Sequence, residues 1–387
     1  MAPSHKAITV PAMKIAYGVM GYGRGHASRV TAVLPALMRD HEVTVFAGGE
    51  AYDFLATRFP TVRIPTLGYV YGRHDGRQLG YSLLATLRNN IPLLTELATE
   101  TGSFRYVVEA FRRLQIELVI SDSEAWTLRA GQRLGLPRIG FDHIGVLAWC
   151  RQQLPPELWL AGQRDALAYR ALMGVPERLL VSSFYPAPPK SANTRVIGPV
   201  LRESVQYAQP QDHGHLLVYL NRGTRQYQPH IHAALRTLNR PVIIYGAGHT
   251  GTEGNVEFRP IDGTAFVRDL SQCHAVMATS GNQLISEALH LGKPILALPE
   301  DAFEQQLNAW MVERMDVGAR AGLTSLKGDD IQRFLDLHGH YCANLASIPP
   351  EPPDTAAEIL RGYIRELRGT RSRPPLKPIG RLARLLV

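Results

Sequence analysis

The sequence predicts an α/β protein in which two open, doubly wound parallel sheets face a central cleft. Short apolar runs alternate with amphipathic segments along the chain, as is typical of stacked strand–helix–strand units. The pattern is interrupted at the polar stretch 203–214 and then starts again. At 387 residues the chain is also too long for one compact core, so two domains are expected.

The first domain is expected to span residues 13–202. It opens with an apolar segment at 13–19, which reads as a buried strand, followed by a glycine loop at 21–25 and a helix at 27–38. Further strands are expected at 42–47, 61–65, 116–120, 138–141 and 195–200, with two helical segments between 79 and 114. The stretch 66–80 is predicted to be a long loop, and such loops are usually functional.

The second domain is expected at 215–350, after a linker at 203–214. Its strands are predicted at 215–220, 241–245, 256–259, 274–278 and 294–298, with helices at 228–238 and around Glu287. A helix at 351–368 is a candidate to pack back on the first domain, and 369–387 is a basic tail. Two such domains bind ligands in the cleft between the carboxyl ends of their strands.

Composition excludes several classes of protein. The net charge is +8, but from residue 361 onward there are eight basic residues and one acid, so the body is nearly neutral and a nucleic-acid channel is not expected. No apolar run reaches the roughly 20 residues that cross a bilayer, and residues 1–11 lack a signal-peptide core. Three scattered cysteines predict neither disulfides nor a zinc site, which favours the cytoplasm.

The tail offers two interpretations. After residue 375, isoleucine and leucines alternate with Arg381 and Arg384, so a short amphipathic helix could lie on an anionic membrane. A solvated, disordered tail fits the same residues. The first interpretation would make the protein peripheral on the inner face of the membrane.

In the first domain, His26 and Asp122 are the candidate catalytic pair. His26 follows the glycine loop at a helix start, where the helix dipole disfavours a protonated ring, so it can act as a general base. Asp122 ends a strand on the same rim and can orient the ring. Simple helix capping by either residue is the alternative, and His143 is the second-choice base.

In the second domain, the candidate ligand-binding residues gather where two helices begin. Glu287 can accept both hydroxyls of a ribose, while the helix start at Ser280, Gly281 and Asn282 meets phosphates. Glu304 and Gln305, and in addition Asn308, open the next helix and can bind sugar hydroxyls. Asn221 and Thr224 follow the first strand of this half as further phosphate contacts, or form an ordinary turn.

These motifs resemble the GT-B glycosyltransferases, with their two Rossmann-like domains. The match runs through Ser280-Gly281, Glu287-Ala288, Gly292-Lys293-Pro294, Glu304-Gln305 and Asn308-Ala309 to Gly318. It is closest to the group of UDP-glucuronosyltransferases and lipid II synthase, in its little-characterised bacterial and archaeal branch, and the loop 21–26 with Arg29 resembles the same group.

The resemblance implies a function for the cleft. Glu287 would bind the ribose of a nucleotide sugar, Gly281 and Asn282 its diphosphate, and Glu304 and Gln305 its sugar, while His26 and Asp122 activate an acceptor hydroxyl. Gly23 and Gly25 count with the donor-binding residues, and Phe266 is a candidate contact for the base.

The expected enzyme is an inverting hexosyltransferase that uses a UDP-sugar as co-substrate and no cofactor. Relatives that retain configuration often carry a second Glu at the position of Thr279, and Asp-x-Asp is missing, so no metal is expected. The acceptor, a small molecule, glycan or lipid-linked alcohol, would contact the first domain. A nucleotide-sugar epimerase or hydrolase and a non-catalytic binding protein are the alternatives.

Overall fold

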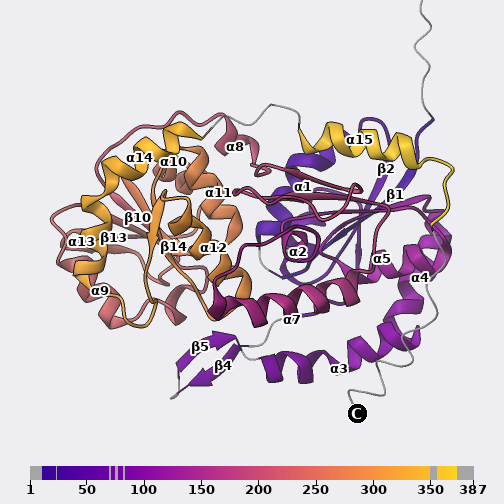
Figure 1. Ribbon diagram of the computed structural model, residues 1–387, viewed down its shortest axis with the longest axis horizontal. Helices are drawn as coiled ribbons and strands as arrows, with labels where there is room; N and C mark the ends of the chain where they lie inside the picture. Colours follow the sequence, from indigo (N-terminus) through magenta and orange to yellow (C-terminus); the bar gives the residue numbers. More distant parts are fainter. Residues whose placement is uncertain are drawn as a thin grey trace, which may run out of the picture.

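The computed structural model describes residues 11–22, 24–68, 71–74, 77–81, 83–348 and 355–372 (Figure 1). The predicted donor residue Gly23 and nearly all of the basic tail, with its possible membrane contact, lie outside the described residues. Within these residues, no helix combines the length and the apolar character that crossing a bilayer requires.

The N-terminal half folds around a seven-stranded sheet of order β3-β2-β1-β6-β7-β8-β9, in which all neighbouring strands run parallel. Helices cover both faces, so the strands at the centre of the sheet are buried along their whole length. The strands are β1 (Lys14–Val19), β2 (Glu42–Ala47), β3 (Thr61–Arg63), β6 (Leu118–Asp122), β7 (Arg138–Asp142), β8 (Arg178–Ser182) and β9 (Thr194–Ile197). The helices are α1 (Arg24–Leu37), α2 (Gly49–Leu55), α3 (Leu83–Thr99), α4 (Ser103–Leu114), α5 (Ala125–Leu134), α6 (Gly145–Trp149) and α7 (Pro156–Met173).

The C-terminal half repeats this plan with a sheet of order β12-β13-β11-β10-β14-β15-β16, where only β12 is antiparallel. Its strands are β10 (Leu216–Tyr219), β11 (Val242–Tyr245), β12 (Gly251–Glu253), β13 (Val256–Arg259), β14 (Ala275–Thr279), β15 (Ile295–Leu298) and β16 (Gly318–Arg320). Its helices are α8 (Glu203–Gln206), the 3-10 turn η1 (Gly223–Arg225), α9 (Pro229–Arg236), α10 (Gly263–Gln272), α11 (Asn282–His290), α12 (Phe303–Arg314), α13 (Gly328–Asp336) and α14 (His338–Ser347). The two sheets confirm the predicted fold class.

The last helix, α15 (Ala356–Leu367), lies beside α1 of the N-terminal half (Figure 1). Its buried face, with Leu360 and Ile364, joins the core formed by α1, α2 and one face of the first sheet. Arg361 donates to the carbonyl of Ala36 at 2.6 Å. The last described helix therefore packs on the N-terminal half.

One local expectation needs correction. The predicted loop at 66–80 contains an antiparallel pair, β4 (Tyr71–His74) and β5 (Arg77–Tyr81), because tyrosine-rich segments favour strands. The predicted linker 203–214 includes the short helix α8, and backbone hydrogen bonds hold its C-terminal end. The amides of Gln211 and His213 donate to the carbonyls of Ser271 and Gln272, both at 2.9 Å.

Both sheets reverse their strand order at a switch point, and the candidate site is expected beside these two points. In the first sheet the reversal lies between β1 and β6, and in the second it lies between β10 and β14. The loops that leave such neighbouring strands diverge and open a crevice at the carboxyl ends. The loop after β1 carries the chain to His26, and β6 ends at Asp122.

Candidate active site in the cleft between the two sheets

A cavity of about 1120 Å³ lies between the two halves and is lined by residues of both. The lining includes His26 and Ser123 from the first half and Glu287, Glu304 and Phe266 from the second. Most of the sequence-predicted residues of the two halves therefore line one cavity, although Asp122, Ser280 and Thr224 are not part of its lining.

His26 is the third residue of α1, and its ring contacts the end of β6. Nδ1 lies 2.7 Å from Oδ1 of Asp122. Arg29, one turn further along α1, donates to both oxygens of the same carboxylate, at 2.9 Å from Nε and 2.6 Å from Nη2. Asp122 and Arg29 are buried, whereas the His26 side chain keeps 17% of its surface exposed. The predicted pair is thus part of a group of three.

The protonation of this group follows from its charges. Burial alone would raise the pKa of Asp122, but the Arg29 guanidinium and His26 hold that pKa below its usual value. An ionised carboxylate only accepts hydrogen bonds, so the proton between Asp122 and His26 sits on Nδ1. Arg29 Nη2, 3.0 Å from Nδ1, then makes no hydrogen bond to the ring. In the neutral ring, the free lone pair of His26 is therefore on Nε2.

Helix capping does not account for Asp122. The N-cap of α5 is Glu124, whose carboxylate accepts from the amides of Trp126 and Thr127 at 2.8 and 2.7 Å. Burial raises the pKa of Glu124 to about 7. Asp122, two residues earlier, uses its two oxygens to accept hydrogen bonds from His26 and Arg29 instead.

His143, the second-choice base, lines the same cavity in a different state. Its Nδ1 donates to the carbonyl of Ser182 at 2.9 Å, which leaves the lone pair on Nε2. Nε2 has no hydrogen-bond partner among the described residues and lies 3.7 Å from Oε1 of Glu304. Burial lowers the pKa of His143 to about 4, so the ring is a weak base at neutral pH.

Glu287 lies on α11 with its side chain 1% exposed, and it is paired. Arg202, just before α8, donates to its two oxygens at 2.9 and 2.6 Å. Gln283, one turn earlier on α11, donates to the same carboxylate at 3.0 Å. Sequence reasoning missed Arg202, because nothing in its local sequence indicates a partner 85 residues away.

The start of α11 presents polar atoms that have no partner. Gly281 is the N-cap, and no other atom lies within 4 Å of the position a Cβ would take there. Ser280 Oγ and Asn282 Oδ1 are buried without hydrogen bonds among the described residues. Buried polar atoms are normally satisfied, so this cluster suits a polar ligand.

The predicted sugar-binding residues of α12 differ in the hydrogen bonds that their side chains already make. Glu304 lines the cavity, and burial raises its pKa against the opposing effect of His26. Gln305 is engaged with Glu300: its Oε1 accepts from the Glu300 amide at 3.0 Å and its Nε2 donates to the carboxylate at 2.8 Å. Asn308 donates to the carbonyl of Ser280 at 3.0 Å and so joins α12 to the start of α11.

Of the other residues predicted to bind the nucleotide sugar, most line the cavity and one lies outside its lining. Gly25 and Asn221 line the cavity, and a Cβ on Gly25 would lie 3.6 Å from Gln283, so the starts of α1 and α11 face each other. Phe266 also lines it and packs edge-on against two tyrosines. Thr224 lies in η1 and is not part of the lining.

Residues 13–337 match the family described as Glycosyl transferase family 1. The chain belongs to this family. An uncharacterized glycosyltransferase of Methanosarcina mazei is 24% identical over 338 residues, which cover 79% of this chain and 85% of that protein.

Solved structures show the same fold. A UDP-glucosyltransferase from Polygonum tinctorium, described as capable of glucosylating indoxyl, gives a TM-score of 0.64 at 13% identity, over 93% of this chain and 99% of that one. MurG of Acinetobacter baumannii gives 0.58 at 10% identity, over 92% and 100%. The chain is therefore a glycosyltransferase with the GT-B fold, as its motifs predicted.

This glycosyltransferase carries a further arginine in the cleft that sequence reasoning missed. Arg222, next to the predicted Asn221, donates to Glu300 at 2.7 Å and to the hydroxyl of Tyr22 at 3.0 Å. It thereby joins the loop after β10 to the loop after β1. The sequence could have indicated Arg222, because a cationic residue next to a predicted phosphate contact is itself a candidate phosphate ligand.

Proposed function

We propose that this glycosyltransferase moves a sugar from a UDP-linked donor to a hydroxyl acceptor, with inversion and without a required metal ion. The observation that carries the proposal is the His26–Asp122 pair on one side of the cavity, with α11 and Glu287 on the other. The pair supplies a base at the place where the starts of α1 and α11 meet.

The donor diphosphate is proposed to bind at the start of α11. The free N–H groups and dipole of a helix N-terminus favour anions, and Gly281 leaves room for a close approach. Arg225 adds positive charge to the lining, whereas Arg222 lines the cavity in an ion pair with Glu300. These groups offset the charge that grows on the leaving diphosphate, which is the task a metal would otherwise perform.

The ribose is proposed to bind Glu287 in place of Arg202. A guanidinium fork and two neighbouring hydroxyls both present two donors to a carboxylate, so one can replace the other. Arg202 is 29% exposed and can move toward solvent, whereas Glu287 is fixed inside the wall. Phe266 then lies on the lining as a contact for the base.

The proposed transfer is a single displacement. His26 Nε2 takes the proton of the acceptor hydroxyl while that oxygen attacks the anomeric carbon. The bond from this carbon to the diphosphate breaks on the opposite face, and its electrons leave with the nucleotide. Asp122 stabilises the imidazolium that forms, and one displacement inverts the configuration.

The acceptor is proposed to have an apolar body, as a lipid-linked or aromatic alcohol does. The N-terminal side of the cavity is lined by many aliphatic side chains. They are Leu67, Leu87, Leu94, Ile144, Leu147, Leu172 and Met173. A sugar acceptor would leave much of this wall without a matching surface.

A donor panel with thermal-shift readout tests the donor site. UDP and at least one UDP-sugar should raise the unfolding temperature by mass action, and His26→Ala should keep this shift and lose transfer. No shift with UDP, TDP or GDP compounds would contradict the donor site. UDP release that needs no added acceptor would favour a hydrolase, and unchanged activity in His26→Ala would exclude His26 as the base.

A further inference from the structure

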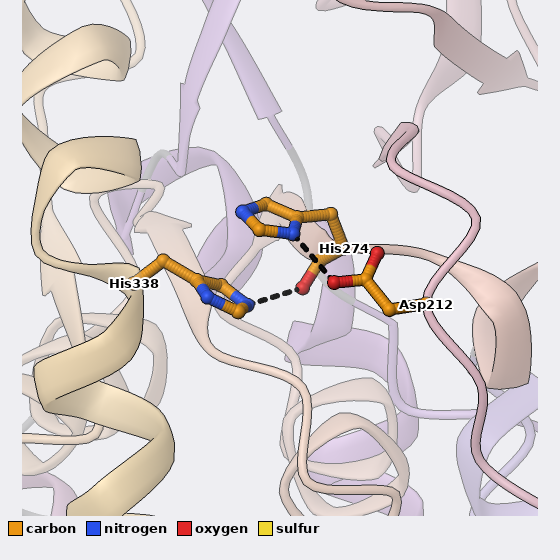
Figure 2. Close-up of side chains that lie close together, drawn as sticks. All are labelled: Asp212, His274 and His338. Atoms are coloured by element: carbon orange, nitrogen blue, oxygen red, sulfur yellow. Dashed lines mark hydrogen bonds and ion pairs between the residues drawn. The ribbon is translucent and has the colours of Figure 1, made fainter.

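A second polar cluster lies away from the cleft, where three segments of the C-terminal half meet (Figure 2). Asp212 belongs to the segment before β10, His274 immediately precedes β14, and His338 is the first residue of α14. Their potential ligand atoms all lie within 4.8 Å of one another. The strand β14 separates this cluster from the start of α11 by roughly 17 Å.

We propose that Asp212, His274 and His338, with Cys342 as fourth donor, form a structural Zn²⁺ site. Imidazole, carboxylate and thiolate are the ligands that zinc takes in closed tetrahedral sites. The site would fasten the segment before β10 to β14 and α14. It is independent of the donor and acceptor chemistry proposed above.

Cys342 is proposed as fourth donor because the spacing on α14 brings it to His338, although its thiol lies outside the group of atoms within 4.8 Å of one another. His338 and Cys342 are four residues apart, so they share one face of the helix. The thiol Sγ lies 3.4 Å from Nε2 and 3.8 Å from Nδ1 of His338. Tetrahedral bonds of about 2.0 Å to nitrogen and about 2.3 Å to sulfur would place two donors roughly 3.5 Å apart.

The hydrogen bonds of the cluster indicate what a metal would replace. His274 Nδ1 lies 2.8 Å from Asp212 Oδ2, and His338 Nε2 donates to the backbone carbonyl of His274 at 2.9 Å (Figure 2). Zinc would take the place of the proton that His274 shares with Asp212. The exposed carboxylate can move outward by the small amount that this exchange requires.

The two imidazole rings must change their relative orientation. Their centroids are 3.6 Å apart and their planes differ by 17°, so the rings stack. The lone pair of an imidazole nitrogen lies in the ring plane, and two stacked rings cannot direct lone pairs at one ion. His338 would turn about its Cβ–Cγ bond and give up its bond to the carbonyl. The proposal therefore includes a local rearrangement.

Some charged groups around the cluster favour a bound cation, and one opposes it. The Asp212 carboxylate, which is half exposed, brings a negative charge to the cluster. Lys293 opposes the metal charge, although its ammonium is held by the carbonyls of Gln211 and Cys273. The thiolate of Cys342 would offset this cation.

Zinc binding by the tag-free full chain tests the proposal, with competition against a chromophoric chelator as readout. We expect one equivalent of Zn²⁺, and His274→Ala or His338→Ala should weaken affinity at least about tenfold. His340→Ala, also on α14, and His213→Ala, beside Asp212, are matched controls that should bind as the parent does. Equal losses in these controls, or parental affinity in His338→Ala, would overturn the site.

Two further variants separate metal binding from folding. Asp212→Asn keeps an acceptor for His274, so it should unfold at the parental temperature in chelator and yet lose zinc affinity. Cys342→Ser should remove the thiolate charge-transfer band of the Co²⁺ complex. A Co²⁺ spectrum that lacks this band in the parent would exclude Cys342 as a ligand. The UDP thermal shift should be the same in all these variants, whichever way the proposed donor site is decided.

Discussion

Arg202 holds both carboxylate oxygens of Glu287, so the residue expected to bind the donor ribose already has a partner. Glu287 is almost completely buried, and a buried carboxylate without a counter-charge is costly. The ion pair therefore stabilises the cleft in the conformation seen here. If the ribose takes the place of Arg202, donor binding and this ion pair compete.

Arg202→Ala is expected to lower stability and to strengthen the response to the donor. Removing a partly exposed partner of a buried charge should cost roughly 1–3 kcal/mol, below the value for a fully buried pair. The thermal shift with UDP should exceed that of the parent, because no ion pair has to be broken. Arg178→Ala, which breaks the more exposed pair with Glu366, is the control and should leave the UDP shift unchanged. A smaller UDP shift in Arg202→Ala would mean that Arg202 contacts the donor itself.

His26→Ala is expected to reduce kcat by roughly 10²–10⁴-fold while UDP affinity stays at the parental value. The reason is that, in the proposed mechanism, Nε2 accepts the proton and makes no contact that the donor needs. Steady-state transfer assays and UDP titration measure the two quantities. A rise in the donor KM with an unchanged kcat would place His26 in donor binding instead.

Asp122→Asn is expected to lower kcat by a similar factor for a different reason. The amide keeps the shape of the carboxylate but does not stabilise the imidazolium. It also leaves the buried guanidinium of Arg29 without its counter-charge, so the variant should unfold at a lower temperature. Activity is therefore compared well below the unfolding temperature of both proteins. Parental kcat in a folded Asp122→Asn would contradict the orienting role.

Much of this site was predictable, because strand ends and helix starts carry recognisable residue patterns. His26 and Asp122 were found from their positions after two strands, and Glu287 from its place on a helix that opens with small residues. The partners of these residues were harder to predict. Arg29 and Arg202 contact Asp122 and Glu287 from 93 and 85 residues away in the sequence, and no local pattern encodes such contacts.

The same reason explains the cluster at His274. The number and spacing of the cysteines predicted no zinc site, because spacing patterns recognise only ligands that are close together in the sequence. Asp212, His274 and His338 come from three segments that only the fold of the C-terminal half brings together. The hairpin β4–β5 was missed because a stretch rich in glycine and arginine reads as a loop.

His143 is expected to make stability depend on acid pH. Its pKa is about 4 in the folded protein and near 6.5 when unfolded, so the unfolded chain binds more protons between these values. The contribution of His143 to the free energy of unfolding should be fully present above about pH 6.5. It should fall by about 1.4 kcal/mol per pH unit as the pH drops toward 4. His143→Asn, which can still donate to the Ser182 carbonyl, should show a flatter curve in denaturant titrations. Equal slopes for both proteins would contradict this.

Gly281→Ala is expected to weaken UDP binding at least about tenfold with no loss of stability. No other atom lies within 4 Å of the new Cβ, so the fold can accept it, but the methyl group would fill the space proposed for the diphosphate. Gly339→Ala, on α14, also adds a Cβ in open space and serves as control. Calorimetric titration with UDP measures the effect, and parental affinity in Gly281→Ala would move the diphosphate away from this helix start.

Leu87→Gln is expected to raise the acceptor KM for an apolar alcohol without changing UDP affinity. Leu87 on α3 is 47% exposed and lines the cavity, so it offers apolar surface that only an acceptor would cover. Ile91, one turn further along α3, is 56% exposed but does not line the cavity, and Ile91→Gln should leave both constants unchanged. Removing a leucine contact of this size should cost roughly 1–3 kcal/mol, or about 10–200-fold in kcat/KM. Equal effects of the two substitutions would show that the acceptor does not contact this wall.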